Sequence, residues 1–161
     1  MALKSFLIDT SQSEVSFSVK KLGFLNIKGT IGELQGEIVF DEYNLGSSSC
    51  KGSVKTDTIN TGNLKRDEHL KGENFFSVDR YPKISFKSDN FFKEKDQFLT
   101  NGGLSILNIA QKISIPFSVD NYLLKAGFSI NRLDYNLGKR FAAFIIGKTV
   151  QISIVLNLIE Q

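Results

Sequence analysis

The sequence predicts an all-β protein of about eight to ten antiparallel strands with one short helix. Three observations support this fold class. Apolar and polar residues alternate in many short segments, turn-forming residues separate these segments, and only one segment has helical features. The length of 161 residues suits one domain, so we expect residues 1–161 to fold as a single unit.

Four segments show the alternation most clearly. EVSFSVK (14–20) places Val15, Phe17 and Val19 on one face and polar side chains on the other. The same pattern recurs in KISFKS (83–88), KISIPFSVD (112–120) and TVQISIVLNLI (149–159). A period of two with β-branched and aromatic residues on one side is typical of strands with one buried face.

The remaining strands are predicted between segments rich in turn residues. We expect them at 23–31, 34–40, 48–58, 98–108, 121–131 and 140–147. The turns that we expect are GELQG (32–36), EYNLGSS (42–48), NGG (101–103), VDN (119–121) and NLGK (136–139).

The helix is predicted at residues 63–72. Asn63 stands in the N-cap position, Leu64 and Leu70 are the apolar members, and Pro82 marks the entry to the next strand. The many strands either form two packed sheets or close into a barrel, because open sheet edges promote aggregation. The alternation alone is consistent with both arrangements.

The composition limits the classes of partner. The chain has 14 Phe, 4 Tyr and no Trp, so many rings must lie in a core or line an apolar cavity. The net charge of +3 comes from dispersed lysines, which favours no nucleic-acid partner. No apolar run approaches the ~20 residues of a transmembrane segment. Without a signal peptide we expect a cytoplasmic protein, or a periplasmic one if a leader has been removed.

Four blocks of the sequence resemble the YceI-like family. The most specific is INTGNLKRDEHLKGENFFSVDRYPKISFKS (59–88), which follows the pattern Thr-Gly…Arg-Asp-x-His-Leu…Phe-Phe…Tyr-Pro-x-Ile-x-Phe-x-Ser. The others are FLIDTSQSEVSFSVKKLGFLNIKGTIGELQGEIVFD (6–41), GGLSILNIAQKISIPFSV (102–119) and INRLDYNLG (130–138). Among the departures, Lys21 replaces a His, and Lys148 stands where an acidic residue is common.

The resemblance implies a lipocalin-like, up-and-down antiparallel barrel of about eight strands, with the helix near the barrel mouth. It also implies non-catalytic binding, storage or transport of a long-chain polyisoprenoid, such as an isoprenoid quinone or a prenyl diphosphate, or of a similar amphiphile. No cofactor is expected. Family members are often described as dimers, so a homodimer is a possible assembly.

Apolar residues on the inward face of the strands, with those of the helical region, are the candidates for contact with such a ligand. They are Phe17, Val19, Phe40, Leu70, Phe75, Phe76, Ile84, Phe86, Leu104, Ile106, Ile115, Phe117, Phe128 and Ile152. Alternatively, the same side chains fill a packed core, as in a stress-associated interaction protein that carries no stoichiometric lipid.

A polar cluster accompanies the helix. Arg66, Asp67 and His69 either bind a polar head group or have a structural role, in which Arg66 and Asp67 pair with Arg132 and Asp134 to cap the barrel end. We favour the structural role, with the helix as a lid. A third hypothesis is a hydrolase or isomerase that uses His69 with Asp67 or Asp134, although no partner nucleophile is indicated.

The remaining reactive residues predict no further site. One His and one Cys are too few for the usual zinc ligand sets, so we expect no metal. Cys50 lies in the small-residue segment GSSSCKGS (46–53), where no neighbour would lower its pKa. We therefore expect a buried or edge residue there and not a reactive thiol.

Overall fold

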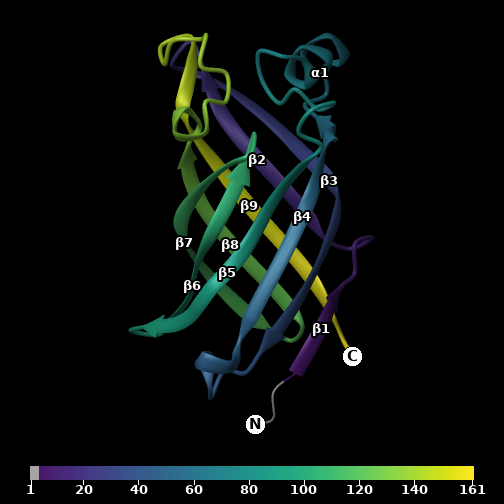
Figure 1. The fold of residues 1–161 in the computed structure, drawn as a ribbon, viewed down its shortest axis with the longest axis vertical. Helices are drawn as coiled ribbons and strands as arrows, with labels where there is room; N and C mark the ends of the chain where they lie inside the picture. Colours follow the sequence, from purple (N-terminus) through teal and green to yellow (C-terminus); the bar gives the residue numbers. More distant parts are fainter. Residues whose placement is uncertain (1–3) are drawn as a thin grey trace.

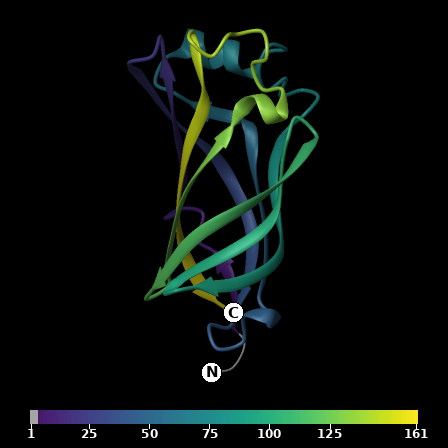
Figure 2. The ribbon, with the colours of Figure 1, turned by 90° about the vertical axis from the view of Figure 1, so that its left-hand side faces the viewer.

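The computed structural model describes residues 4–161, which form a closed antiparallel β-barrel with one α-helix at one end (Figures 1 and 2). The strands are β1 (Lys4–Ile8), β2 (Glu14–Lys21), β3 (Leu25–Phe40), β4 (Ser49–Asn60), β5 (Lys83–Glu94), β6 (Gln97–Ile106), β7 (Ile109–Asp120), β8 (Leu123–Asn131) and β9 (Ile146–Glu160). The helix α1 is Leu64–Lys71, and short 3-10 turns lie at Leu45–Ser47 and Arg132–Tyr135.

Eight strands close the barrel, as predicted. The order is β3-β2-β9-β8-β7-β6-β5-β4, and β4 pairs back with β3. The ninth strand, β1, extends the position of β2, because both pair with β3 on one side and β9 on the other. β1 and β2 thus lie end to end between β3 and β9, and the loop between Ile8 and Glu14 separates them. All pairings are antiparallel, and the pairing of β4 with β3, which closes the sheet on itself, confirms the barrel and removes the alternative of a sandwich.

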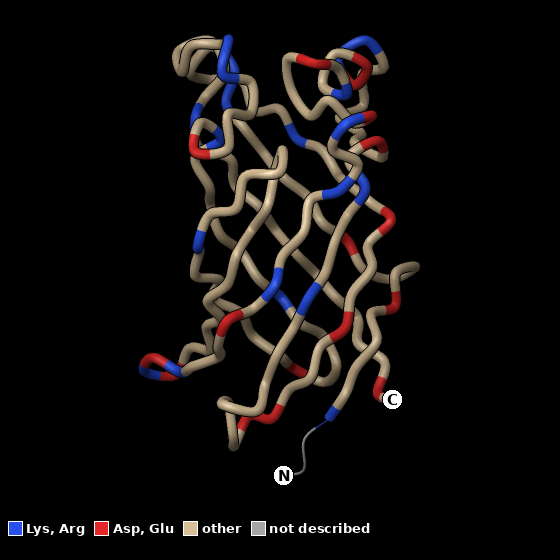
Figure 3. Tube along the Cα trace, viewed as in Figure 1, with Lys and Arg blue, Asp and Glu red and all other residues tan. Residues whose placement is uncertain are grey.

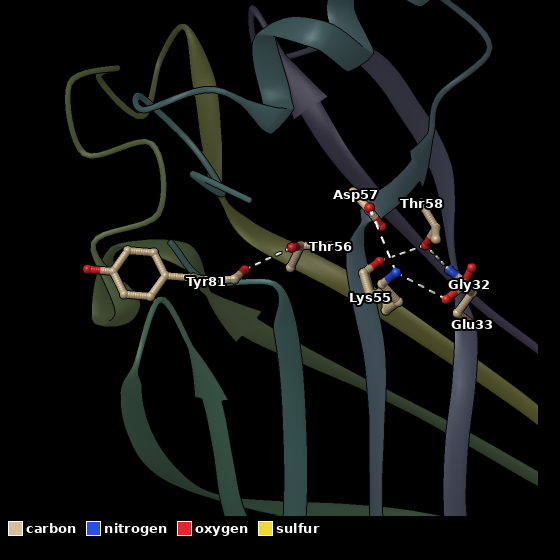
Figure 4. Close-up of polar contacts among 7 residues, drawn as sticks. All are labelled: Gly32, Glu33, Lys55, Thr56, Asp57, Thr58 and Tyr81. Carbon is tan, nitrogen blue, oxygen red and sulfur yellow. Dashed lines mark hydrogen bonds and ion pairs between the residues drawn. The ribbon is translucent and has the colours of Figure 1, made fainter. Parts of the chain in front are cut away.

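The predicted turn GELQG is wrong, because β3 continues through it. The register between β3 and β4 shifts at Gly32 instead, and Glu33 has a φ of 48°. The Gly32 N–H donates to Thr58 Oγ1 (2.6 Å), and that hydroxyl donates to the Lys55 carbonyl (2.6 Å; Figure 4). Lys55 Nζ also lies 3.4 Å from Glu33 Oε2. The irregularity is a bulge that bends two long strands where the barrel closes.

Two other predicted elements need correction. The NGG segment lies inside β6, with Gly102 and Gly103 paired to Ser88 and Lys87. A Cβ on Gly102 would lie 2.4 Å from the Lys87 carbonyl, so close strand packing accounts for this glycine. Most of the strand predicted at 140–147 is a loop, and β9 begins only at Ile146.

The helix is confirmed, with Asn63 as its N-cap. The Asn63 side chain accepts a hydrogen bond from the Arg66 N–H (3.0 Å). Of the two apolar members of the helix, Leu70 packs against the core, whereas Leu64 is 86% exposed.

The wall of the barrel is incompletely paired between β7 and β8. β7 pairs with β8 only where Phe117–Asp120 meets Leu123–Ala126. Towards the end that carries α1 the two strands diverge, as Figure 2 shows, and Ile109–Pro116 pairs with β6 alone. Gln111 Nε2 donates to the Asp134 carbonyl (2.9 Å), which ties β7 to the 3-10 turn that follows β8.

Candidate functional site

A long apolar cavity follows the barrel axis. Its volume is about 460 Å³, and all eight barrel strands contribute to its wall. On β9 the lining residues extend from Ile146 to Leu158, about 40 Å of strand path at ~3.3 Å per residue. At a typical strand tilt of about 40° this is about 30 Å along the axis. The cavity is therefore long and narrow, a shape suited to an extended chain.

All of the predicted ligand-contact residues lie on the wall of this cavity. Their contact with a ligand stays a prediction. The sequence reasoning missed other lining residues of the same strand faces, among them Ile8, Ile38, Ala126, Ile154 and Leu156. Alternation could have found these, because Ile154 and Leu156 simply continue the inward face of Ile152. Phe141 and Ile145 gave no such signal, because they lie in a loop.

Aromatic rings pack at the cavity end opposite α1. Phe40 packs edge-on against Phe98 (ring centroids 5.4 Å apart) and Phe117 (5.8 Å), and Phe91 packs against Phe117 (5.6 Å). Phe91 and Phe117 are buried. Such edge-to-face pairs stabilise beyond their buried area and fill this end of the barrel.

The α1 end is also lined by aromatic rings but reaches the surface. Phe75 stacks on Phe141 with centroids 5.1 Å apart, and the His69 ring lies edge-on to both, at 5.2 and 5.8 Å. Lys20, Lys21 and His69 are exposed residues that also line the cavity. The apolar interior therefore meets polar side chains at this end.

Thr61 organises the polar cluster of α1. Asp67 is buried, and its carboxylate accepts from both the Thr61 N–H (2.9 Å) and the Thr61 hydroxyl (2.5 Å). Arg66 Nε donates to Thr61 Oγ1 (2.8 Å), and its Nη2 donates to the Thr61 carbonyl (2.7 Å). Asp67 thus fixes the start of the helix, whereas Arg66 keeps N–H groups beyond these two bonds and lines the cavity.

Arg132 has a different role from Arg66. It is 2% exposed, and its five N–H groups meet five backbone carbonyls. Nε donates to Gly147, Nη1 to Leu137 and Gly138, and Nη2 to Phe141 and Ile146, at 2.6–3.0 Å. Burial lowers the pKa of Arg132. This side chain holds together the loop from 137 to 147 and has no donor left for a ligand.

The predicted pairing of Arg66 and Asp67 with Arg132 and Asp134 is wrong. Asp67 and Arg66 bond to Thr61, and Arg132 bonds to carbonyls. The Asp134 residue is exposed, and its carbonyl accepts from Gln111. The Asp67 carboxylate is thus directed at Thr61 and not at His69, which gives the hypothesis of a His–Asp catalytic pair no support.

Cys50 lies on the cavity wall near the end opposite α1. Burial raises the pKa of its thiol to about 11, and a hydrogen bond with the Ser88 side chain lowers it by less. At neutral pH the residue is a neutral thiol in an apolar environment, in agreement with the sequence-based expectation.

Two further kinds of feature are absent from the described residues. Between residues 4 and 161, no three His, Cys, Asp or Glu side chains are grouped so that they could hold a metal ion. In that same part of the chain, no helix has the length and apolar character needed to cross a membrane.

Comparison with known proteins agrees with this geometry. The YceI-like domain family matches residues 6–158. The protein YceI of Salmonella arizonae is 27% identical over 101 residues, which cover 63% of this chain and 53% of that protein. The chain thus spans about half the length of the curated relatives it matches.

Two solved structures have the same fold. BcnA of Burkholderia cenocepacia superposes with a TM-score of 0.84 at 19% identity, covering 92% of this chain and 98% of that one. A polyisoprenoid binding domain from Saccharophagus degradans superposes with a TM-score of 0.72 at 13% identity, covering 97% of this chain and 98% of that one. At these identities the likeness concerns the fold.

Proposed function

The chain belongs to the YceI-like domain family, and from this premise we propose that it binds a single-chain amphiphile with its apolar tail inside the barrel. The ligand class is a long-chain polyisoprenoid, such as an isoprenoid quinone or a prenyl diphosphate. The protein stores or carries this ligand and does not transform it. The observation that carries the proposal is the long, narrow apolar cavity that ends at Arg66 and His69.

Apolar burial supplies the binding free energy. Each methylene-sized group that leaves water for the cavity contributes ~0.8 kcal/mol, so a long tail can be held without specific polar contacts. The cavity volume of about 460 Å³ falls within the range of about 300–1,000 Å³ typical of small-molecule sites. A cavity of this size favours a carrier over the alternative of an interaction protein with a packed interior.

Arg66 and His69 are the residues that we assign to the head group. Both line the cavity at the α1 end, and the two described hydrogen bonds of Arg66 leave part of its guanidinium N–H groups for a ligand. A diphosphate or a quinone carbonyl would accept such bonds. Asp67 and Arg132 have structural roles in this arrangement, because Asp67 already bonds to Thr61 and Arg132 to backbone carbonyls.

The test is native mass spectrometry of freshly purified protein, followed by organic extraction and identification of the released molecule. We expect one amphiphile with a long apolar tail per chain. A protein that is empty as purified and that binds no added polyprenyl lipid would contradict the proposal.

A matched pair of variants locates the ligand. Ala126 lies on the cavity wall, where its register partners Phe117 and Ile154 are also lining residues. Ala126→Phe places a ring in the cavity and should abolish retention of the lipid. Ala110→Phe makes the same substitution at an exposed position of β7, so it should retain the lipid like the unmodified protein. Equal retention by both variants would mean that the lipid is bound elsewhere.

The hydrolase or isomerase alternative is tested at His69. If the protein only binds its ligand, the extracted amphiphile stays chemically unchanged on prolonged incubation with the purified protein, and His69→Ala makes no difference to this. If the unmodified protein converts the ligand and the His69→Ala variant does not, the non-catalytic assignment is contradicted.

A further inference from the structure

Exposed apolar side chains gather on two neighbouring loops at the α1 end. The β2–β3 hairpin presents Leu22 (51% exposed), Phe24 (72%) and Leu25 (44%), and the loop before β9 presents Phe144 (76%). A hydrogen bond from the Leu22 N–H to the Ile145 carbonyl (2.9 Å) joins the two loops. Figure 1 shows both loops at the end of the barrel that carries α1. We call these four residues the apolar rim.

Packing within the barrel does not explain the apolar rim. Leu22 has a φ of 53°, in the left-handed region that is unfavourable for leucine, and half of the residue is exposed. Phe24 and Phe144 lie in loops and are 72% and 76% exposed, so their rings contribute little to the packing of the barrel. Exposed apolar side chains gathered on neighbouring loops in this way mark a site of interaction.

The same two loops carry only positive charge. Lys20, Lys21, Lys139, Arg140 and Lys148 are all exposed, and neither Lys20–Lys28 nor Asn136–Lys148 contains an acidic residue. Within residues 4–161 none of these five side chains forms a salt bridge. The basic residues on these loops, in blue at the α1 end of Figure 3, thus remain available for an anionic surface.

The apolar rim also borders the cavity. Lys20, Lys21, Ile145 and Ile146 line the cavity and belong to, or directly flank, the two loops. Any partner that covers the rim therefore faces the end of the apolar interior where Arg66 and His69 lie.

We infer that the two loops dock the barrel on the surface of a bilayer that contains anionic lipids. Aromatic and aliphatic side chains enter the boundary between head groups and acyl chains, and lysines and arginine bind the anionic head groups around them. In this orientation the cavity faces the membrane, so a lipid tail can pass between bilayer and barrel without crossing water. The inference rests on the proposed function, because a bilayer is the source of such amphiphiles.

A bilayer fits this surface better than a nucleic acid or a second copy of the chain. Nucleic-acid sites combine basic residues with aromatic rings on which bases stack, whereas two of the four rim residues are leucines. A second copy would present the same positive charge against these loops, which opposes association of rim with rim.

The experiment is flotation of the protein with vesicles of phosphatidylcholine and with vesicles of phosphatidylcholine and phosphatidylglycerol. We expect the protein to float with the mixed vesicles, and the bound fraction to fall as salt is added. Phe24→Ser combined with Phe144→Ser should weaken binding at least about tenfold, since two buried rings are lost. Lys21→Gln combined with Lys139→Gln should weaken it on mixed vesicles only.

Tyr43→Ser is the matched control. Tyr43 is 73% exposed, like Phe24, but it lies between β3 and β4 at the opposite end of the barrel. This variant should bind vesicles as the unmodified protein does. An equal loss in Tyr43→Ser and in the Phe24/Phe144 variant, or no binding to mixed vesicles, would overturn the inference. So would a dimer in sedimentation that the Phe24/Phe144 variant dissociates, because the rim would then join two copies.

Lipid content measured on the same samples separates this inference from the proposed function. A protein that retains its lipid and does not float overturns the docking surface alone. A protein that floats but never carries a lipid overturns the proposed function and, with it, the role of the surface in lipid exchange.

Discussion

Arg132 shows how one residue can organise a region that has no secondary structure of its own. The guanidinium bonds to three backbone carbonyls of the loop between the 3-10 turn and β9, and to two more at the start of β9. This loop also carries Phe141, which stacks on Phe75 at the cavity end. The position of the aromatic cluster, and hence the shape of the α1 end, depends on this buried cation.

Replacing Arg132 should therefore destabilise the whole fold. Arg132→Met removes five hydrogen bonds to backbone carbonyls in and beside the loop, and we expect a loss of about 3–5 kcal/mol in the free energy of unfolding. Arg140→Met is the control, because Arg140 is exposed and within residues 4–161 its side chain bonds only to Asn74, so a change within about 0.5 kcal/mol is expected. Urea unfolding measures both. Similar values for the two variants would mean that the loop does not depend on Arg132.

Cys50 provides a second test at this scale. Its pKa is raised from 9.0 to about 11, so the thiolate fraction at neutral pH is about 100-fold smaller than for an unperturbed thiol. Because the thiolate is the nucleophile, we expect alkylation of Cys50 by iodoacetamide to be slower by at least this factor in the folded protein than in urea. The rate should rise with pH up to about 11. Alkylation at the rate of the unfolded chain would contradict the burial of this side chain.

Among the elements, the strands were predictable and their irregularities were not. Alternation in 14–20, 83–88, 112–120 and 149–159 located β2, β5, β7 and β9, because a one-sided core imposes period two on any strand. GELQG looked like a turn, since two glycines are typical of turns. In the barrel Gly36 allows β3 to pack closely, because a Cβ there would lie 2.6 Å from the Lys51 carbonyl, whereas Gly32 lies at the register shift between β3 and β4.

For the candidate site too, the sequence predicted the residues of regular strands but not the contacts made by loops. The inward residues followed from alternation, and all of the predicted ones line the cavity. The polar partners did not follow, because Thr61 and the carbonyls around Arg132 are brought together by loops whose course no periodicity encodes. Charge alone suggested that Arg66 and Asp67 would pair with Arg132 and Asp134, but a single threonine and backbone oxygens satisfy these groups instead.

The divergence of β7 and β8 predicts a difference in amide exchange. Where Phe117–Asp120 meets Leu123–Ala126, β8 pairs with β7 on one side and β9 on the other, so protection should be continuous along Leu123–Ala126. In Ile109–Ser114 and Gly127–Asn131, the amides that face away from β6 and β9 have no strand partner, so they should exchange faster than their neighbours. Hydrogen exchange followed by NMR measures this. Uniform protection along β7 would show that the gap closes in solution.

At the scale of the molecule, the barrel has two core clusters instead of one. Ile59, Phe75, Leu104 and Tyr135 belong to the cluster at the α1 end, whereas Phe6, Ile38, Leu156 and Leu158 form the other. The apolar cavity extends between them, and its wall makes fewer contacts than a packed interior would. The side chains of the cavity wall therefore lack apolar contacts, and an apolar tail in the cavity would supply them.

Removal of the ligand should therefore weaken the fold, and its return should restore it. A ligand that binds only the folded state adds about 2.7 kcal/mol at 100 times its dissociation constant. We expect delipidated protein to unfold at lower urea concentration than protein as purified, and added polyprenyl lipid to reverse this change. Ala110→Phe should respond in the same way. Ala126→Phe should not, because its ring occupies the cavity and replaces part of the missing contacts. If lipid raised the midpoint of both variants equally, the stabilising site would lie outside the barrel.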